Sequence, residues 1–158
     1  MCGRISLTTP ARVLAELFGV SIPFGLRPRY NIAPTQRTLI VRAGEGGREA
    51  VLARWGFVPP WRRAGEKGPE PINARSESAA SSRLFAPALG ARRCVAPACG
   101  FYEWQALPGR KAKQPWRIEP RGAAAFALAG LWSRWAPLGA EPVDTFAILT
   151  CAPNAVMR

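Results

Sequence analysis

The sequence predicts an α+β fold in which mostly antiparallel sheets form the core and a few short helices accompany them. Several short segments alternate apolar and polar residues between turn signals, as strands do. Two of these segments are joined by a glycine-rich link that is typical of a β-hairpin. Clear helical periodicity is limited to short stretches.

The first element is a short helix over residues 9–19. Val13, Leu14, Leu17 and Phe18 form one apolar stripe, which predicts ordinary packing against a core. Thr9 is suited to cap the helix, Pro10 to its first turn and Gly19 to its end.

The remaining elements are mainly strands. Residues 38–43 and 49–57 predict the hairpin, and residues 58–71, with Trp61 in their middle, predict a loop. Residues 72–77 lead into a short helix over 76–82, and 84–89 form a second helical piece. A strand is predicted over 94–104, a basic turn over 108–114, and three further strands over 116–119, 124–132 and 145–152.

The charge balance predicts a polyanionic partner. The chain has 22 basic and 10 acidic residues, a net charge of +12, and most of its basic residues are arginine. Arginine binds phosphate through two hydrogen bonds and stacks on bases, so nucleic acid is the favoured partner. No apolar run is long enough for a membrane span and no signal sequence opens the chain, so we expect a cytoplasmic protein.

The cysteines do not predict a disulfide framework or a metal centre. The chain has four cysteines, no closely spaced pair of the kind zinc requires, and no histidine. Cys94, Cys99 and Cys151 lie in apolar stretches and are predicted to be buried small hydrophobes. We expect no cofactor.

Cys2 differs from the other three cysteines. If Met1 is removed, Cys2 carries a thiol and a free α-amine, with ordinary pKa values of about 8.5 and 7.7–8.0. Such a 1,2-aminothiol condenses with an aldehyde to an imine, and the thiol then closes a thiazolidine ring. Taken alone, the position favours an idle N-terminal residue, and the rest of the chain must supply the evidence for a nucleophile.

Three other groups are candidates for chemistry near Cys2. Glu103 lies between aromatic residues in a strand, so partial desolvation would suit it to proton transfer. Asn73 and Arg75 pair an amide with a guanidinium, which suits a sugar hydroxyl beside a phosphate, and Arg4 can hold a phosphate near Cys2.

Aromatic and proline side chains are candidates for contacts with bases. Pro34, Trp55, Trp61 and Trp104 are predicted to stack on single-stranded bases or to wedge between them.

Six motifs, in their order along the chain, resemble those of SRAP-domain proteins, the SOS response-associated peptidase family. The motifs are Met1-Cys2-Gly3-Arg4, Tyr30-Asn31-Ile32-Ala33-Pro34-Thr35, Arg54-Trp55-Gly56, Asn73-Ala74-Arg75-Ser76-Glu77, Gly100-Phe101-Tyr102-Glu103-Trp104 and Thr150-Cys151-Ala152-Pro153-Asn154. The resemblance implies a barrel-like arrangement of the sheets. It also implies a protein that binds abasic sites in single-stranded DNA and shields them during the SOS response to DNA damage.

The resemblance also implies residue roles. Cys2 forms a Schiff base and then a thiazolidine with the ring-opened deoxyribose, which is lyase-like chemistry. Glu103 assists ring opening and proton transfer, and Asn73 orients the sugar. The phosphate-binding arginines are Arg4, Arg75 and Arg83, and the stacking or wedging residues are Pro34, Trp61 and Trp104. We expect a monomer that works in the cytoplasm at the nucleoid.

One departure from the family pattern is expected to matter. The family's catalytic histidine lies in a His-x-Arg-Met-Pro motif after the last strand noted above, and this sequence contains no histidine. We therefore expect residues 1–158 to be a single SRAP domain that is incomplete at its C-terminus.

Two alternatives stay open on the sequence. The first is a cysteine-type peptidase, a hydrolase that uses Cys2 as an N-terminal nucleophile and removes its own Met1. The second is a basic single-strand DNA binder without a covalent step, whose binding falls steeply with salt and ignores an abasic site.

Overall fold

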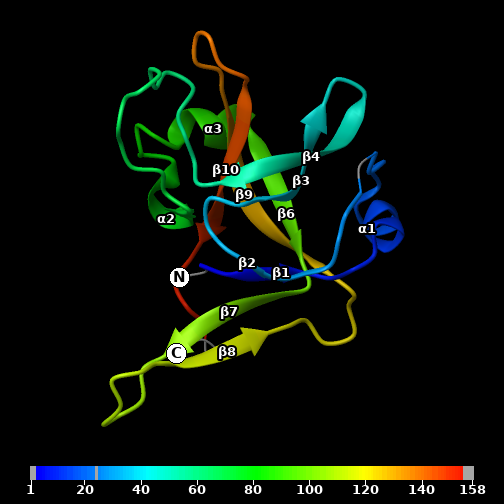
Figure 1. Ribbon diagram of the computed structural model, residues 1–158, viewed down its shortest axis with the longest axis vertical. Helices are drawn as coiled ribbons and strands as arrows, with labels where there is room; N and C mark the ends of the chain where they lie inside the picture. Colours follow the sequence, from blue (N-terminus) through cyan, green and yellow to red (C-terminus); the bar gives the residue numbers. More distant parts are fainter. Residues whose placement is uncertain (1–2, 24, 155–158) are drawn as a thin grey trace.

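A closed β-barrel dominates the structure (Figure 1). The computed structural model describes residues 3–23 and 25–154. The barrel strands are β3 (Arg37–Gly44), β4 (Gly47–Trp55), β6 (Arg93–Ala98), β9 (Phe126–Trp135) and β10 (Val143–Thr150). They follow the order β4, β3, β6, β9, β10, and a pairing between β10 and β4 closes the ring. The predicted α+β class with mostly antiparallel sheets is confirmed.

Parallel pairing is confined to β10. This strand runs parallel to β4, with Phe146 opposite Trp55, and parallel to the short strand β5 (Asn73–Arg75), with Ile148 opposite Asn73. Its pairing with β9 is antiparallel. β10 therefore holds both the barrel closure and the strand that carries Asn73 and Arg75.

A second sheet lies across one end of the barrel (Figure 1). Its order is β2 (Arg29–Ile32), β1 (Ile5–Leu7), β7 (Gly100–Gln105) and β8 (Gln114–Ile118). All of its pairings are antiparallel, and β7 and β8 form a hairpin that projects from the body. The predicted 94–104 strand is thus two strands, because the chain passes from the barrel to the second sheet at Cys99.

The helices cover the outside of the barrel. They are α1 (Ala11–Phe18), α2 (Ser76–Ala79) and α3 (Ala86–Ala91). Gly19 ends α1 in the left-handed conformation at φ 61°, as glycine does at helix C-termini. Thr9 does not cap α1, because its hydroxyl donates to the carbonyl of Ala124 at 2.5 Å. No helix among the described residues is long and apolar enough to cross a membrane.

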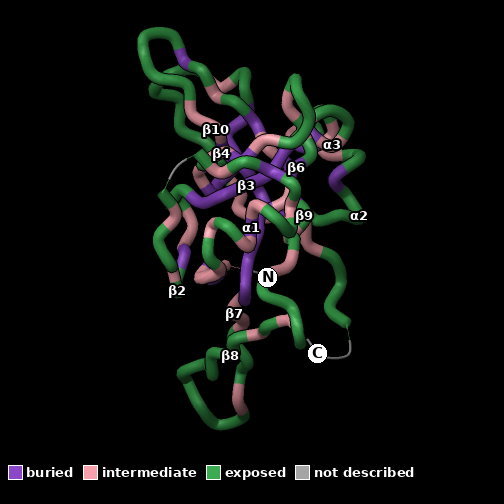
Figure 2. The backbone as a smooth tube through the Cα atoms, turned by 90° about the vertical axis from the view of Figure 1, so that its right-hand side faces the viewer, coloured by how far each residue is buried: buried purple, intermediate pink, exposed green. Residues whose placement is uncertain are grey.

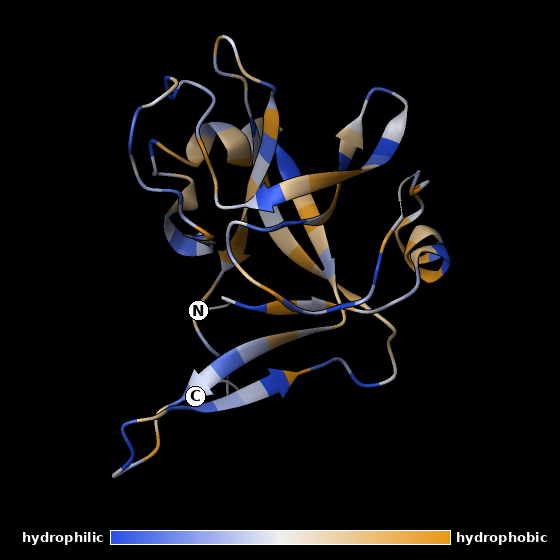
Figure 3. Cartoon of the chain, in the orientation of Figure 1, coloured by the Kyte–Doolittle hydropathy of each residue, from blue (hydrophilic) through white to orange (hydrophobic). Residues whose placement is uncertain are grey.

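Buried side chains form two clusters, one mainly inside the barrel and one beneath α2 and α3. The first includes Ile40, Ala53, Trp55, Phe146 and Ile148, and the second includes Phe57, Phe85, Leu131 and Ala147. Burial and hydropathy follow the same division, since the barrel strands are the most buried and most apolar part of the chain (Figures 2 and 3). Exposed positions concentrate on loops and on the projecting hairpin (Figure 2).

Candidate functional site

A broad groove of about 770 Å³ separates the β7–β8 hairpin from the barrel end where β10 finishes. Aliphatic and aromatic side chains make much of its lining, and charged groups stand on both walls. The lining residues are Arg75, Phe101, Glu103, Trp104, Gln105, Trp116, Arg117, Ile118, Leu128, Ile148, Leu149, Thr150, Cys151, Ala152, Pro153 and Asn154. The groove has the dimensions of a ligand site and brings Glu103, Arg75 and Trp104 together.

Strand β1 leads the N-terminal segment to this site. The amide of Tyr102 donates to the carbonyl of Arg4 at 2.9 Å, so residue 4 lies beside the strand that carries Glu103. The Arg4 guanidinium donates to the Asn31 side-chain oxygen at 2.7 Å. Cys2 lies outside the described residues.

Glu103 lies on the groove wall formed by β7. Phe101, Glu103 and Gln105 all contribute to the lining, and Glu103 is directly opposite Trp116 in β8. The indole of Trp116 donates to the Gln105 side-chain oxygen at 3.0 Å. Glu103 is half-buried, as expected for a carboxylate between aromatic groups.

Asn73 is fixed through the backbone on either side of it. The carbonyl of Ile72 accepts one hydrogen bond from the Ile148 amide at 2.9 Å and a second from the Trp55 indole at 2.8 Å. Asn73 then pairs with Ile148 across β5 and β10. The half-buried Asn73 is therefore held by the closed barrel rather than by a loop.

Trp55 is not a stacking surface for bases, contrary to the sequence prediction. Its side chain is fully buried, and its ring stacks on Phe146 with centroids 6.2 Å apart. A solvent-exposed ligand cannot reach it. Its contribution is the indole hydrogen bond to the Ile72 carbonyl, next to Asn73. The motif Arg54-Trp55-Gly56 pointed to Trp55 but did not indicate this hydrogen bond.

Glu77 holds in place a segment that lines the groove, and it is a residue that sequence reasoning missed. Its carboxylate accepts the Ala152 amide at 2.8 Å, which joins α2 to the segment after β10. Its own backbone amide, then the Ala152 amide, lower the pKa of Glu77 below the ordinary value of 4.5, with smaller contributions from Ser76 and Arg75. The motif that contains Asn73 and Arg75 was the available signal.

The other predicted contacts are distributed around the molecule. Pro34 is half-buried in the turn after β2, close in sequence to the Asn31 that binds Arg4. Trp61 is 58% exposed in the loop 58–71 and does not line the groove. Its neighbour Arg62 accepts a hydrogen bond from Trp135, at the opposite end of β9 from the groove. Arg83 is exposed between α2 and α3 and is also outside the groove lining.

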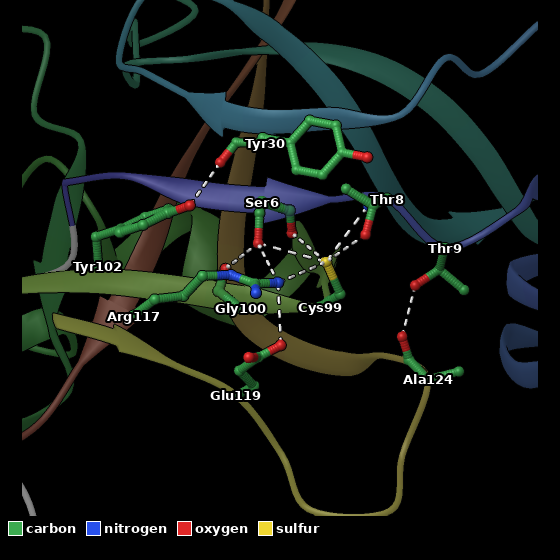
Figure 4. Close-up of polar contacts among 10 residues, drawn as sticks. All are labelled: Ser6, Thr8, Thr9, Tyr30, Cys99, Gly100, Tyr102, Arg117, Glu119 and Ala124. Atoms are coloured by element: carbon green, nitrogen blue, oxygen red, sulfur yellow. Dashed lines mark hydrogen bonds and ion pairs between the residues drawn. The ribbon is translucent and has the colours of Figure 1, made fainter.

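Cys99 fastens the second sheet where the chain leaves the barrel (Figure 4). Its sulfur lies 3.3 Å from the Ser6 hydroxyl, 3.2 Å from the Thr8 hydroxyl and 3.3 Å from the Thr8 amide. Burial alone raises the pKa of the Cys99 thiol, but the hydrogen bonds from Ser6 and Thr8 outweigh burial, with a further one from Arg117, and the net shift is downward.

The burial predicted for cysteines holds for Cys94 and Cys99 but is wrong for Cys151. Burial raises the pKa of Cys94 to about 12, with Arg42 opposing it, so this thiol stays protonated. Cys151 is exposed because β10 ends at Thr150 and the chain then opens into the groove wall. Among the described residues, no group of three His, Cys, Asp or Glu side chains could hold a metal ion.

Comparison with known proteins gives consistent matches over the whole chain. The model of the family described as SOS response associated peptidase (SRAP) matches residues 1–158. "Abasic site processing protein YoaM" of Bacillus subtilis is 38% identical, over 100% of this chain and 70% of its own length. "Abasic site processing protein YedK" of Escherichia coli is 33% identical, over 98% of this chain and 69% of its own length.

A solved structure of a protein with low sequence identity supports the fold. A crystal structure of a Bacteroides thetaiotaomicron protein superposes with a TM-score of 0.88 at 24% identity. The match covers 98% of this chain and 70% of that protein.

Proposed function

Because the chain belongs to the SOS response associated peptidase (SRAP) family, we propose that it binds abasic sites in single-stranded DNA and captures them covalently through Cys2. The relatives named above are abasic site processing proteins. The observation that carries the proposal is a groove with Glu103 on one wall and Arg75 on the other, beside the strand that holds Arg4. β7 presents Glu103 and pairs with β1, its Tyr102 amide donates to the Arg4 carbonyl, and β5 presents Arg75 on the opposite wall.

The proposed reaction joins an aminothiol to an aldehyde. After removal of Met1, the α-amine of Cys2 attacks C1′ of the ring-opened deoxyribose, and the resulting carbinolamine loses water to give an imine. The thiolate then adds to the imine carbon, and the nitrogen takes up a proton as the thiazolidine closes. One water leaves in total, and no oxidant or reductant is required.

In this reaction Glu103 carries protons and Asn73 orients the sugar. Glu103 supplies a proton to the departing hydroxyl and assists opening of the sugar, a role that suits a half-buried carboxylate. Asn73, on a strand fixed by the barrel, orients the open sugar. Arg4 and Arg75 hold flanking phosphates, Arg83 holds a more distant one, and Pro34, Trp61 and Trp104 contact bases. The protein acts as a monomer at damaged DNA in the SOS response.

The decisive experiment is adduct formation with an abasic single-stranded oligonucleotide. We expect wild-type protein lacking Met1 to form a heat-stable adduct visible in a denaturing gel, with an intact mass equal to both components minus one water. Cys2→Ala abolishes the adduct, and Cys2→Ser, which cannot form a thiazolidine, yields no heat-stable product. An equally stable adduct from Cys2→Ala would refute the proposal.

The family description carries the word peptidase, so self-removal of Met1 is the second candidate activity. The same mass measurement separates the two. Aminopeptidases of the expression host remove Met1 before a small residue, so we expect Glu103→Gln to lack Met1 as wild type does while forming its adduct more slowly. Retention of Met1 in Glu103→Gln alone would instead establish self-processing.

A further inference from the structure

A second cavity lies on the other side of β2 from Arg4 and carries arginines from two strands. It has a volume of about 250 Å³ and lies between the start of β2 and the start of β3. Its lining residues are Leu7, Gly25, Leu26, Arg27, Arg29, Arg37, Thr38, Leu39 and Leu52. The walls are otherwise apolar or small, so the three guanidinium groups set its electrostatic character.

These arginines are not neutralised by carboxylates. The ion pairs within residues 3–23 and 25–154 join other arginines to Glu16, Glu49, Glu70, Glu119 and Asp144. Arg29 is instead fixed by donating to the Arg37 carbonyl and to the Gln36 side chain. Arg27 and Arg37 are exposed. The cavity is thus a concentrated positive site with one immobilised and two accessible guanidinium groups.

The cavity is connected to Arg4 by the strand β2. Asn31, which binds Arg4, lies two residues from Arg29, a separation of about 7 Å in an extended strand. Between them stands Tyr30, with 70% of its surface exposed and its ring pointing away from Tyr102 (Figure 4). The Tyr30 carbonyl is anchored by the Tyr102 hydroxyl at 2.8 Å, so the strand beneath the ring is held in place.

An exposed aromatic ring between cationic groups is the pattern by which proteins hold single strands. Bases stack on the ring, and arginines take the phosphates on either side. Asn31, which binds Arg4, is followed along β2 by Tyr30 and then by Arg29, which lines the cavity.

We propose that β2 extends the DNA path beyond the abasic site, with Tyr30 stacking on a neighbouring base and the Arg27–Arg29–Arg37 cavity binding a backbone phosphodiester. This inference rests on the proposed function for the position of the abasic nucleotide. It assigns to the protein a second phosphate subsite, which gives single strands that extend past the lesion tighter binding than minimal ones.

The experiment compares a long single-stranded oligonucleotide with a trinucleotide, each with a central tetrahydrofuran in place of the abasic sugar. This analogue lacks the aldehyde, so binding is measured by competition or anisotropy without a covalent step. The test variant is Arg27→Ala/Arg37→Ala. The control is Arg63→Ala/Arg134→Ala, which removes the same charge at exposed positions near the opposite barrel end, where Arg62 contacts Trp135.

For the long oligonucleotide, the slope of log affinity against log salt should fall by about 0.7, since the cavity binds one phosphodiester and each phosphate contact on a single strand contributes about 0.7. At about 0.15 M salt this corresponds to roughly a 4-fold loss of affinity. The trinucleotide should bind the test variant and the wild type equally. Tyr30→Ala should weaken long-strand binding at unchanged salt slope, whereas Tyr30→Phe should retain it.

Three results would overturn the inference. An equal loss in the Arg63/Arg134 control would mean that only net charge matters, an equal loss with the trinucleotide would place these arginines at the lesion itself, and no loss would leave the cavity unused. Failure of the proposed function has a different signature. In that case wild type forms no adduct with authentic abasic DNA, while the dependence of long-strand binding on Arg27 and Arg37 persists.

Discussion

Trp55 shows how a buried residue can govern a site it never touches. Its indole donates to the Ile72 carbonyl, next to Asn73, while its ring fills the barrel beside Phe146. The same carbonyl accepts the Ile148 amide, so strand pairing survives if the indole bond is lost. What the indole adds is a fixed orientation for β5, and through it for Asn73.

The replacement Trp55→Phe tests this positioning role. Loss of the indole donor and of part of the ring should lower the free energy of unfolding by about 1–3 kcal/mol and slow adduct formation several-fold. Trp135→Phe is the control, because the Trp135 indole makes an equal 2.8 Å bond to the Arg62 carbonyl at the far barrel end. We expect both variants to be destabilised to a similar extent in urea and only Trp55→Phe to form the adduct slowly. Equal rates of adduct formation in the two variants would contradict a positioning role for Trp55.

Residue-level prediction from the sequence worked where local pattern decides the outcome. The strand predicted around Glu103 is present as β7, and Glu103 lines the groove together with Phe101, Trp104 and Gln105. The sequence did not distinguish Trp55 from Trp104, because both follow a basic or acidic residue in a strand, and only barrel closure buries one and exposes the other. The burial predicted for Cys151 was wrong because β10 ends at Thr150, one residue before Cys151.

At the scale of elements, the short helix α2 and the end of β10 are joined by a single carboxylate. Glu77 accepts the Ala152 amide, and its pKa is lowered. The folded state therefore favours the ionised form. The resulting stabilisation is fully present above the ordinary value of 4.5 and is lost as the pH falls through the lowered folded value.

Glu77→Gln should consequently destabilise the protein near neutral pH but have a vanishing effect at acidic pH. Urea unfolding of the wild type and the variant across this range measures the difference. Glu45→Gln, an exposed change in the β3–β4 turn, provides the comparison and should give no such pH-dependent difference. If Glu77→Gln lowered the free energy of unfolding by the same amount at every pH, the charge of Glu77 would not contribute to its contact with Ala152.

The elements themselves were predicted unevenly. The β3–β4 hairpin is local, and its glycine-rich link and alternation were sufficient to predict it. The division of the 94–104 segment at Cys99 depends on Ser6 and Thr8, which lie more than ninety positions earlier in the chain. No local pattern contains that information, which explains why one strand was predicted in place of two.

At the scale of the whole molecule, the barrel interior changes character from one end to the other. Apolar residues fill the part near the second sheet, whereas Arg42, Glu49 and Asp144 meet near the other end. The Arg42 side chain is 7% exposed, lies 2.6 Å from Glu49 and 3.1 Å from Asp144, and its guanidinium is 3.9 Å from the Trp132 ring centre. These contacts place the Arg42 charge between two carboxylates and an aromatic ring, although Arg42 Nη1 and Asp144 Oδ1 have no hydrogen-bond partner among the described residues.

Arg42→Met should lower the free energy of unfolding by roughly 3–5 kcal/mol, because Asp144, mostly buried, would lose its 3.1 Å ion pair and keep only the exposed Arg134 at 4.0 Å. The double variant Arg42→Met/Asp144→Leu should recover much of this loss, since the stranded charge is gone. Chemical denaturation of the single and double variants measures both. A double variant no more stable than the single one would mean that the pair itself, rather than an abandoned charge, holds this end closed.

The pairing of β1 with β7 also determines when, during synthesis, the N-terminal strand can join the fold. Ile5 is made early, but its partner Phe101 is synthesised only roughly 5–20 s later at ordinary rates of translation. During that interval β7 does not yet exist, so the groove cannot form. Under the proposed function, enzymes that remove Met1 from nascent chains therefore act before β1 can pair with β7.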